Sequence, residues 1–257
     1  MNTLSLAVRD SRTMVGRQLK RLIRYPSMTV QLVITPVIIL LLFVYVLGGT
    51  LGSGLGGGRD AYIDYVLPGI LLMAVATGAT GTAVMVATDM TEGIIARFRT
   101  MRISRASVLT GHVVAAVIQQ IIGIAVVIAI ALAIGFRPNA TALDWVAATA
   151  LLTLFALAIT WLSVALGLKS STPEAASNAP MPLVLLPFLG SGFVPTDSMP
   201  TALRWFAEYQ PFTPIMQTIR GLLLGTHIGN DAAIAVAWCA GIAVVSYLWA
   251  KHTFNKA

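Results

Sequence analysis

The stretch that decides the fold reads TDMTEGIIARFRTMRISRASVL and covers residues Thr88–Leu109. It carries four arginines and two acids, and it lies between two long runs, 65–88 and 106–136, in which no residue is charged. Each run is long enough to cross a bilayer, because a hydrocarbon core of ~30 Å needs roughly 20 helical residues. The stretch therefore indicates a short basic segment that joins two membrane-spanning helices.

The whole chain has the composition of an integral membrane protein. Its 257 residues are 57% hydrophobic and only 11% charged, and the mean hydropathy is +0.83. Soluble domains carry about 25% charged residues. Lipid offers no hydrogen-bond partner to free backbone groups, so helices are the expected spanning form. The fold class predicted is an all-α membrane protein.

Six windows without Asp, Glu, Lys or Arg predict six transmembrane helices in a single domain, 1–257. The shortest window has 19 residues, and the fifth predicted span contains three prolines. The predicted spans are Met28–Leu47, Tyr65–Thr88, Val113–Ile134, Val146–Leu168, Ala176–Val194 and Ala232–Ala250.

The lysines and arginines predict the orientation, because cytoplasmic loops carry an excess of them. With both termini inside, thirteen of the 17 basic residues face the cytoplasm and four face outward. We therefore expect a multi-pass protein of the inner (plasma) membrane with cytoplasmic termini. The net charge of +7 is an orientation signal, and no nucleic-acid partner is expected. The four outer residues are Arg59, Arg137, Arg204 and Arg220.

Two segments outside the spans are amphipathic. Residues 1–26 predict an interfacial helix whose basic side meets lipid phosphates, with a solvated tail as the alternative. Residues 195–228 hold two short amphipathic patterns, each introduced by a proline. Eleven uncharged residues, Tyr209–Ile219, are too few to cross a bilayer, so outer re-entrant or interfacial helices are expected there.

Enzymatic chemistry is not expected of this chain. Its three histidines, His112, His227 and His252, fall in separate parts of the predicted layout, and no metal-binding motif is present. The nearest fragment to a P-loop, Gly167–Ser170, lacks the first glycine and the Gly-Lys step, so the chain has no ATPase motif of its own.

The opening stretch suits a docking role. Ile94, Phe98 and Met101 follow helical spacing, while Arg97 and Arg99 lie off that stripe. Asp89 and Glu92 stand where a cap and a first-turn acid would begin a short cytoplasmic helix, 89–105. The alternative is a helix lying flat on anionic lipid.

The segment EGIIARFRTMRISRASVLTGHV resembles the one after span two in ABC-2 type permeases, in particular daunorubicin-resistance-like drug exporters. SGFVPTDSMPTALRWFAEYQPFTPIMQTIRGLLLG resembles that family's segment after span five. The resemblance covers nearly the whole chain. It implies two partners for this chain: a second, identical permease, and a separate ATP-binding cassette ATPase that binds ATP and Mg²⁺. No cofactor is expected in this chain itself.

The resemblance also implies roles for particular residues. The family's coupling helix would dock the ATPase, and it corresponds to Glu92, Gly93, Ile94, Arg97, Phe98, Arg99 and Met101. Substrate would pass between two permeases along spans one, two and five. Polar or aromatic residues within the predicted spans are candidates for the lining of this pathway. For the polar residues, hydrogen bonds between helices are the alternative role. The candidate pathway residues are Gln31, Phe43, Gln119, Asn178 and Phe188.

The expected function is the membrane subunit of an exporter for a hydrophobic small molecule, drug-like or lipid. The sparse aromatic content of spans one and five favours such a cargo over a glycan. One alternative is an ATP-independent carrier or channel for an apolar solute, although the six windows lack the ionisable groups that ion coupling often uses. A second alternative is an assembly or sensor subunit that transports nothing.

Overall fold

The computed structural model describes residues 15–16, 26–93 and 105–256, and every regular element in these ranges is helical. This agrees with the all-α prediction. The predicted interfacial helix 1–26 and residues 94–104 of the predicted coupling helix lie outside the described residues. The elements are α2 (Pro26–Leu41), the π-helical η1 (Leu42–Leu47), α3 (Gly48–Ser53), α4 (Gly58–Thr91), α6 (Arg105–Ala133), α7 (Ala142–Lys169), α8 (Pro173–Asn178), α9 (Met181–Leu185), the 3₁₀ turn η2 (Thr196–Ser198), α10 (Thr201–Tyr209), α11 (Phe212–Leu224) and α12 (Asp231–Lys256).

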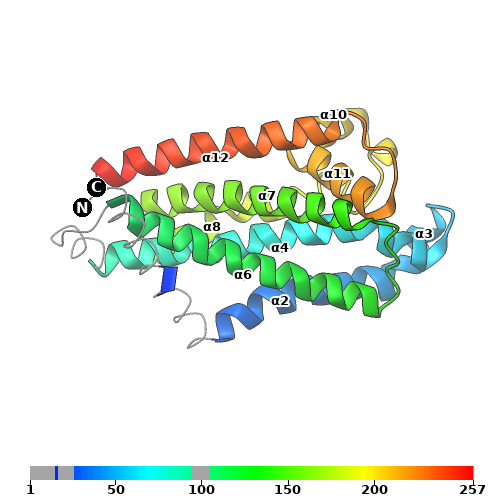
Figure 1. Cartoon of the computed structure of the whole chain (residues 1–257), viewed down its shortest axis with the longest axis horizontal. Coiled ribbons are helices and arrows are strands. Elements are labelled where there is room, and N and C mark those ends of the chain that lie inside the picture. The colour runs from blue at the N-terminus through cyan, green and yellow to red at the C-terminus, as the bar shows by residue number, and fades with distance from the viewer. Residues whose placement is uncertain (1–14, 17–25, 94–104, 257) are drawn as a thin grey trace.

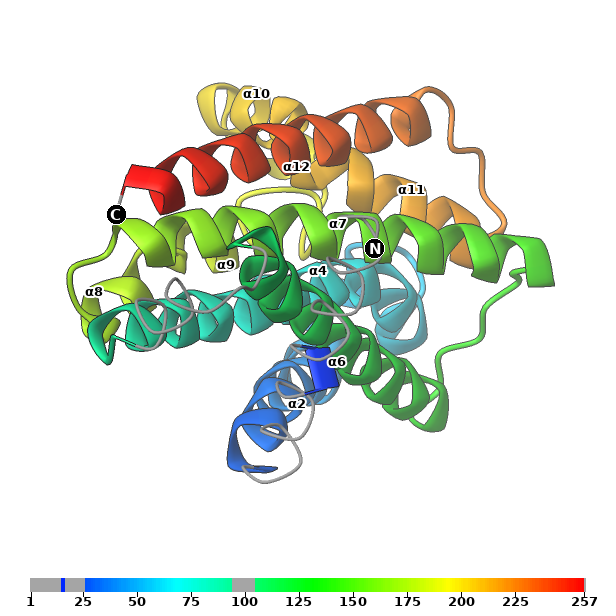
Figure 2. The same ribbon diagram turned by 60° about the vertical axis from the view of Figure 1, so that its left-hand side comes forward.

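Five helical stretches in the described part of the chain are long and apolar enough to cross a membrane. They run side by side as an elongated bundle, with α12 along one side, α2 along the other and α4, α6 and α7 between them (Figures 1 and 2). The short elements α3, α10 and α11 gather at one end, and the end of α12 lies at the other (Figure 1). The five stretches are Leu32–Ser53, Gly58–Thr91, Leu109–Ala133, Ala142–Lys169 and Asp231–Phe254.

The core forms around α4 and α7. Helix α7 packs most extensively against α12 and α4, and the middle of α4 is buried on all sides. Small residues permit this approach, as they do in many membrane helix pairs. A Cβ atom built on Gly167 of α7 would lie 2.5 Å from the carbonyl oxygen of Ala83 in α4. The two backbones are therefore in direct contact at this point.

A Gly167→Ala substitution is expected to destabilise the protein by about 1–3 kcal/mol, because the added methyl group must push α7 away from the α4 backbone. Thermal unfolding of the purified protein measures this as a Tm lower by several degrees. Gly241→Ala is the matched control, since no atom of the part of the chain that the structure describes lies within 4 Å of a Cβ built on Gly241 in α12. An unchanged Tm for Gly167→Ala would contradict the packing described here.

The predicted fifth span, Ala176–Val194, is not a continuous helix. It consists of α8, a turn, α9 and further turns to residue 194. Pro180, Pro182 and Pro187 explain the breaks, because proline lacks the backbone N–H and its ring clashes with the preceding helical turn. The sequence window is long enough for a span, but its prolines prevent one continuous α-helix.

The broken segment, residues 173–194 from the start of α8, nevertheless follows α4 for most of that helix's length. Near its start, Ala176 packs with Ala83 and Ala87 of α4. Near its end, the Tyr62 hydroxyl donates a hydrogen bond of 3.1 Å to the carbonyl of Phe193. The 25 helical residues that separate Tyr62 from Ala87 correspond to ~37 Å. The segment therefore lies against both ends of a helix that is long enough to cross a bilayer.

Two short helices, α10 and α11, lie within the outer segment 195–228. Pro200 and Pro211 occupy their N-cap positions. The Gln210 side-chain amide, between the two helices, donates to the carbonyl of Leu186 at 3.0 Å, and Phe212 packs edge-on against Phe155 of α7 at 5.1 Å. The pair is thus attached both to the broken segment and to the bundle.

Candidate functional site

One candidate site is the end of α4 that precedes residues 94–104. Glu92 is exposed and forms the C-cap, with its N–H donating to the Thr88 carbonyl at 2.9 Å. Gly93 follows with φ +70°, a conformation that glycine adopts without strain and that commonly ends a helix. Of the predicted docking residues, Glu92 and Gly93 are therefore placed at this helix end. The other predicted docking residues lie outside the described residues: Ile94, Arg97, Phe98, Arg99 and Met101.

The sequence interpretation of Asp89 is wrong. Asp89 lies within the last turns of α4 and is 1% exposed, so it does not cap a separate helix. Its Oδ2 atom lies 3.1 Å from Nε2 of His112, which is 2% exposed on α6. The pair connects the end of α4 to the beginning of α6. It therefore fixes the two helices on either side of residues 94–104.

Asp89→Ala is expected to lower the free energy of unfolding by about 3 kcal/mol, because it leaves a buried polar partner uncompensated. His112→Ala should have a similar effect. The double variant should be much less destabilised than the sum of the two, since each substitution removes the same contact. Thermal or denaturant unfolding of the wild type, the two single variants and the double variant completes a double-mutant cycle. Strictly additive losses in the free energy of unfolding would show that the contact is energetically unimportant.

A second candidate site combines two of the predicted pathway residues. Phe43 of η1 and Phe188 of the broken segment lie 6.2 Å apart between ring centroids. Phe193 joins them, 4.7 Å from Phe43 and stacked on Phe188 at 4.1 Å with an interplanar angle of 2°. Three aromatic rings thus pack where the π-helical part of the first helix meets the broken segment. π-Helical turns are frequent at functional sites.

Two other predicted pathway residues, Gln119 and Asn178, do not join this aromatic cluster. Gln119 is half-buried on α6, and Asn178 is exposed at the end of α8. Of Gln31, only the backbone position in α2 is described. The neighbouring Gln120 is buried and donates to the Thr160 hydroxyl of α7 at 3.1 Å, which is the helix–helix hydrogen bond that the sequence left open as an alternative.

Large apolar side chains remain exposed on both sides of the aromatic cluster. On the first helix these include Tyr45 and Val46, the latter 71% exposed. On the broken segment they are Met181, Leu185 and Leu189, which recur every four residues and form one stripe. Exposed apolar side chains thus occur on both elements that contribute rings to the aromatic cluster.

Arg220 of α11 is buried beside the outer part of the bundle, with 9% of it exposed. Its Nη2 donates to the carbonyls of Tyr65 in α4 at 2.9 Å and of Ser191 at 2.8 Å. Its Nη1 donates to Gln217 Oε1 at 2.8 Å, and its guanidinium lies over the Tyr65 ring at 3.9 Å. One side chain therefore holds α11, α4 and the broken segment together.

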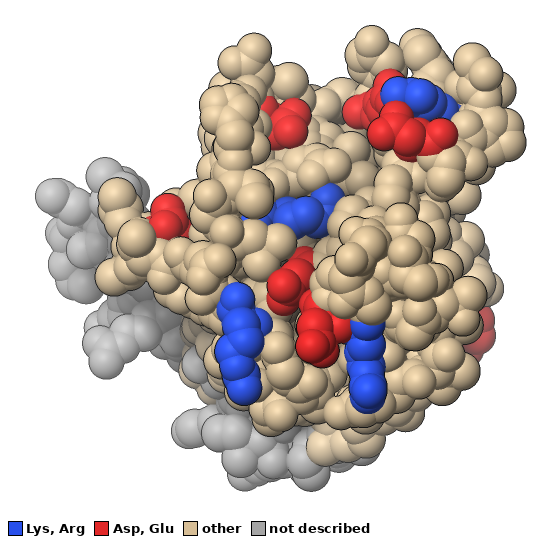
Figure 3. Space-filling view, turned by 90° about the vertical axis from the view of Figure 1, so that its right-hand side faces the viewer, with Lys and Arg blue, Asp and Glu red and all other residues tan. Residues whose placement is uncertain are grey.

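The end of the molecule that carries α3, α10 and α11 displays charges of both signs (Figure 3). On α10, Arg204 contacts the carboxylates of Asp197 at 2.6 Å and Glu208 at 2.7 Å. The hydrogen bond that Arg204 donates to the Glu208 carboxylate, followed by the negative charge of Asp197, raises the pKa of Arg204. Trp205 and Tyr209 of the same helix are each 66% exposed. Aromatic residues beside paired charges are typical of a membrane–water interface.

Sequence reasoning missed the contacts of Arg220, the Asp89–His112 pair and the contribution of Phe193 to the aromatic cluster. The position of Arg220 among apolar residues is a signal in the sequence that this side chain makes buried contacts. The Asp89–His112 pair and the Phe43–Phe193 contact join positions 23 and 150 residues apart, and no local pattern reveals them.

Comparison with known proteins is consistent with this architecture. Residues 10–224 match the family model described as ABC-2 type transporter. The chain is 28% identical over 241 residues to the daunorubicin resistance ABC transporter permease protein DrrB1 of Streptomyces coeruleorubidus, covering 93% of this chain and 83% of that protein. It is 25% identical over 217 residues to the probable doxorubicin resistance ABC transporter permease protein DrrC of Mycobacterium tuberculosis, covering 83% and 78% of the two chains. The chain belongs to the ABC-2 type transporter family and is a multi-pass membrane permease similar to drug-resistance permeases.

Proposed function

We propose that this chain forms the transmembrane pathway of an exporter for hydrophobic small molecules and that a separate ATP-binding cassette subunit powers it. The observation that carries the proposal is the exposed apolar surface around Phe43, Phe188 and Phe193, where a π-helical turn meets a broken segment. A bilayer-soluble cargo can contact such a surface without losing hydration of charged groups. The relatives named for daunorubicin and doxorubicin resistance support the same cargo class.

We infer that the broken segment 173–194 is a sixth membrane crossing. It follows α4 from Ala87 to Tyr62, a distance that exceeds the ~30 Å of a hydrocarbon core. Non-helical backbone at membrane depth is tolerated where protein or a cavity covers it. If 173–194 crosses the membrane, α12 crosses it once more and ends on the side on which α4 ends. Both chain termini are therefore cytoplasmic in this proposal.

The ATPase subunit docks, in this proposal, at the end of the bundle marked by Glu92 and Gly93. The four arginines assigned to the outside by sequence belong to elements at the opposite end, as the contacts of Arg137 with the α6 terminus and of Arg220 with Tyr65 indicate. The Asp89–His112 pair would transmit movement of the docked segment to α4 and α6 together, because it joins both helices beside that segment.

The second permease is proposed to pack beside the apolar stripe formed by Met181, Leu185 and Leu189. Two copies facing each other through this stripe and the exposed side chains of η1 would enclose the aromatic cluster from each chain. Nucleotide-driven closure of two ATPase subunits would then alter the space between the permeases and release cargo outward. Helices α10 and α11, held by Arg220, would cover the outer exit.

The proposal is tested by transport into inside-out vesicles containing this chain and its co-purified ATP-binding subunit. We expect ATP to drive uptake of daunorubicin, and we expect uptake to continue when a protonophore collapses the proton gradient. Leu185→Trp should reduce uptake, because the larger side chain enters the proposed pathway. Val245→Trp, at an exposed apolar position on α12, is the matched control and should retain uptake.

Uptake that needs the proton gradient and ignores ATP would support a secondary carrier instead. Uptake that is ATP-driven but equally affected by Leu185→Trp and Val245→Trp would retain the exporter and reject the pathway. The two results separate the energy source from the route of the cargo.

A further inference from the structure

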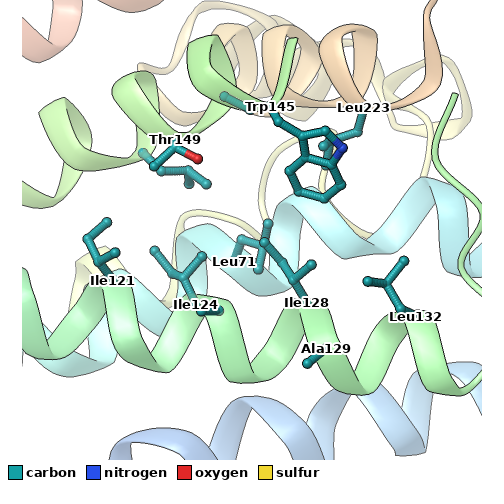
Figure 4. A pocket seen from close by; sticks show the side chains of 12 residues that line it. Leu71, Ile121, Ile124, Ile128, Ala129, Leu132, Trp145, Thr149 and Leu223 are labelled. Carbon is teal, nitrogen blue, oxygen red and sulfur yellow. The ribbon is translucent and has the colours of Figure 1, made fainter. Parts of the chain in front are cut away.

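A cavity of about 290 Å³ lies between α6 and α7, away from the aromatic cluster, with α4 behind it (Figure 4). Its walls are nearly all hydrocarbon. Among the described residues that line it, side-chain polar groups are limited to the indole of Trp145 and the hydroxyl of Thr149. Apolar cavities of this kind exclude water and bind apolar ligands. Aliphatic side chains that line it include Leu71, Ile124, Ile128 and Leu132.

The cavity opens on the outer surface of the bundle. Ala125 and Ala129 of α6 and Thr149 of α7 line it and are exposed. The neighbouring α6 surface is also apolar, with Ile122 55% exposed. Since α6 and α7 both have the length and composition of membrane spans, the opening faces the hydrocarbon of the bilayer.

A shallow groove along α7 continues from the cavity. It shares Trp145 and Thr149 with the cavity and extends to Leu157. The twelve helical steps from Trp145 to Leu157 correspond to ~18 Å. Half of a hydrocarbon core is about 15 Å. The groove therefore has the length of one acyl chain in a single leaflet.

A basic group lies at the end of α6 nearest this site. Arg137 is exposed, and its Nη1 donates to the carbonyls of Leu132, which lines the cavity, and Phe136, at 3.0 and 3.1 Å. Two acids lie near it: Asp64 of α4 accepts a hydrogen bond from the Arg137 backbone, and Asp144 at the start of α7 accepts hydrogen bonds from Thr141 in a capping box. Arg137 thus supplies a positive charge beside the apolar opening, complementary to a lipid phosphate.

We propose that the cavity between α6 and α7 binds one acyl chain of a membrane phospholipid. The second chain lies along the α7 groove, and the phosphate lies beside Arg137. This lipid is a bound component of the permease at a site separate from the cargo surface around Phe43 and Phe188. The proposal depends on the membrane placement of α6 and α7 and is independent of the ATPase partner.

Native mass spectrometry of the purified protein, titrated with phosphatidylglycerol in detergent, tests the site. We expect the wild type to retain one lipid molecule. Ala125→Phe should bind phosphatidylglycerol at least about tenfold more weakly than the wild type, because the phenyl ring fills the cavity. Ala237→Phe, at an exposed position on α12, is the matched control and should bind as the wild type does. Arg137→Gln should weaken binding of phosphatidylglycerol and leave binding of diacylglycerol unchanged.

A second measurement does not require the filled-cavity variant to fold. Trp145 is retained as the sole tryptophan, the other four being replaced by phenylalanine, and its fluorescence is measured with a phospholipid brominated in its acyl chains. Saturation of quenching at a low fraction of brominated lipid is expected for a bound chain. Quenching proportional to the bulk fraction of brominated lipid, or equal lipid retention by Ala125→Phe and the wild type, would overturn the proposal. Displacement of the bound lipid by daunorubicin at transport concentrations would assign the cavity to cargo and would also overturn it.

Discussion

Arg220→Met is expected to lower the free energy of unfolding by at least about 3 kcal/mol and to abolish transport. Hydrogen bonds to a charged group contribute about 1.5–3 kcal/mol each, and a desolvated cation over an aromatic ring contributes about 2 kcal/mol. Methionine preserves much of the side-chain length and removes every donor. The carbonyl of Ser191 then loses the partner that holds the broken segment against α11. Thermal unfolding of the purified protein gives the stability loss.

Arg204→Met is the matched control for this substitution. Arg204 is also an arginine in the outer segment, but it is 46% exposed and paired with two exposed carboxylates. Exposed ion pairs typically contribute about 0–1 kcal/mol, so its loss should change the Tm little. Arg220→Lys should recover only part of the stability, since one ammonium cannot reproduce the planar set of donors. Equal Tm values for Arg220→Met and Arg204→Met would show that Arg220 does not hold these elements together.

Phe98→Ala is expected to reduce ATP-driven transport at least about tenfold while the protein remains inserted in the membrane. The reason is the sequence pattern that places Phe98 on the apolar stripe of the proposed docking segment. Removing one central contact of an interface commonly costs more than ~1 kcal/mol, and ~1.4 kcal/mol corresponds to tenfold weaker binding. Glu92→Ala, at the exposed end of α4, should have the same direction of effect.

The measurement is the ratio of transported daunorubicin to ATP hydrolysed by the reconstituted complex. Glu208→Ala is the control, because Glu208 is an exposed acid on α10, at the other end of the molecule. Normal transport in both Phe98→Ala and Glu92→Ala would reject the docking assignment. Loss of transport in Glu208→Ala alone would place the sensitive region at the opposite end.

Hydropathy was sufficient to predict the long helices because a membrane span needs only length and the absence of charge. Hydropathy could not predict the backbone of 176–194. This segment is also long and uncharged, but Pro180, Pro182 and Pro187 break the helix. Helix-capping patterns misplaced Asp89 for a similar reason. An acid before an apolar stripe suggests a cap, and its burial against His112 depends on how α4 and α6 pack.

For the candidate site, residue type alone gives only candidates. The sequence points to Phe43 and Phe188 because they are aromatic residues of the first and fifth predicted spans; their ring centroids lie 6.2 Å apart, and their place on a cargo pathway stays a prediction. Gln119 and Asn178 are candidates for their polarity, which does not specify the face of a helix. Arg220 was counted as an outer-loop charge, yet Tyr65 and Ser191 bury it. Contacts between distant positions determine these outcomes.

Cysteine labelling of the assembled complex tests the central claim most directly. In a Cys239→Ala background, single cysteines are introduced at Glu92 and at Tyr209, which lie in the proposed inner and outer ends of the bundle. We predict that a membrane-impermeant maleimide labels Tyr209→Cys from outside intact cells, and that Glu92→Cys is labelled only after permeabilisation and cross-links to the ATP-binding subunit. Labelling of Glu92→Cys from outside, or cross-linking of the ATPase subunit to Tyr209→Cys instead, would contradict the account.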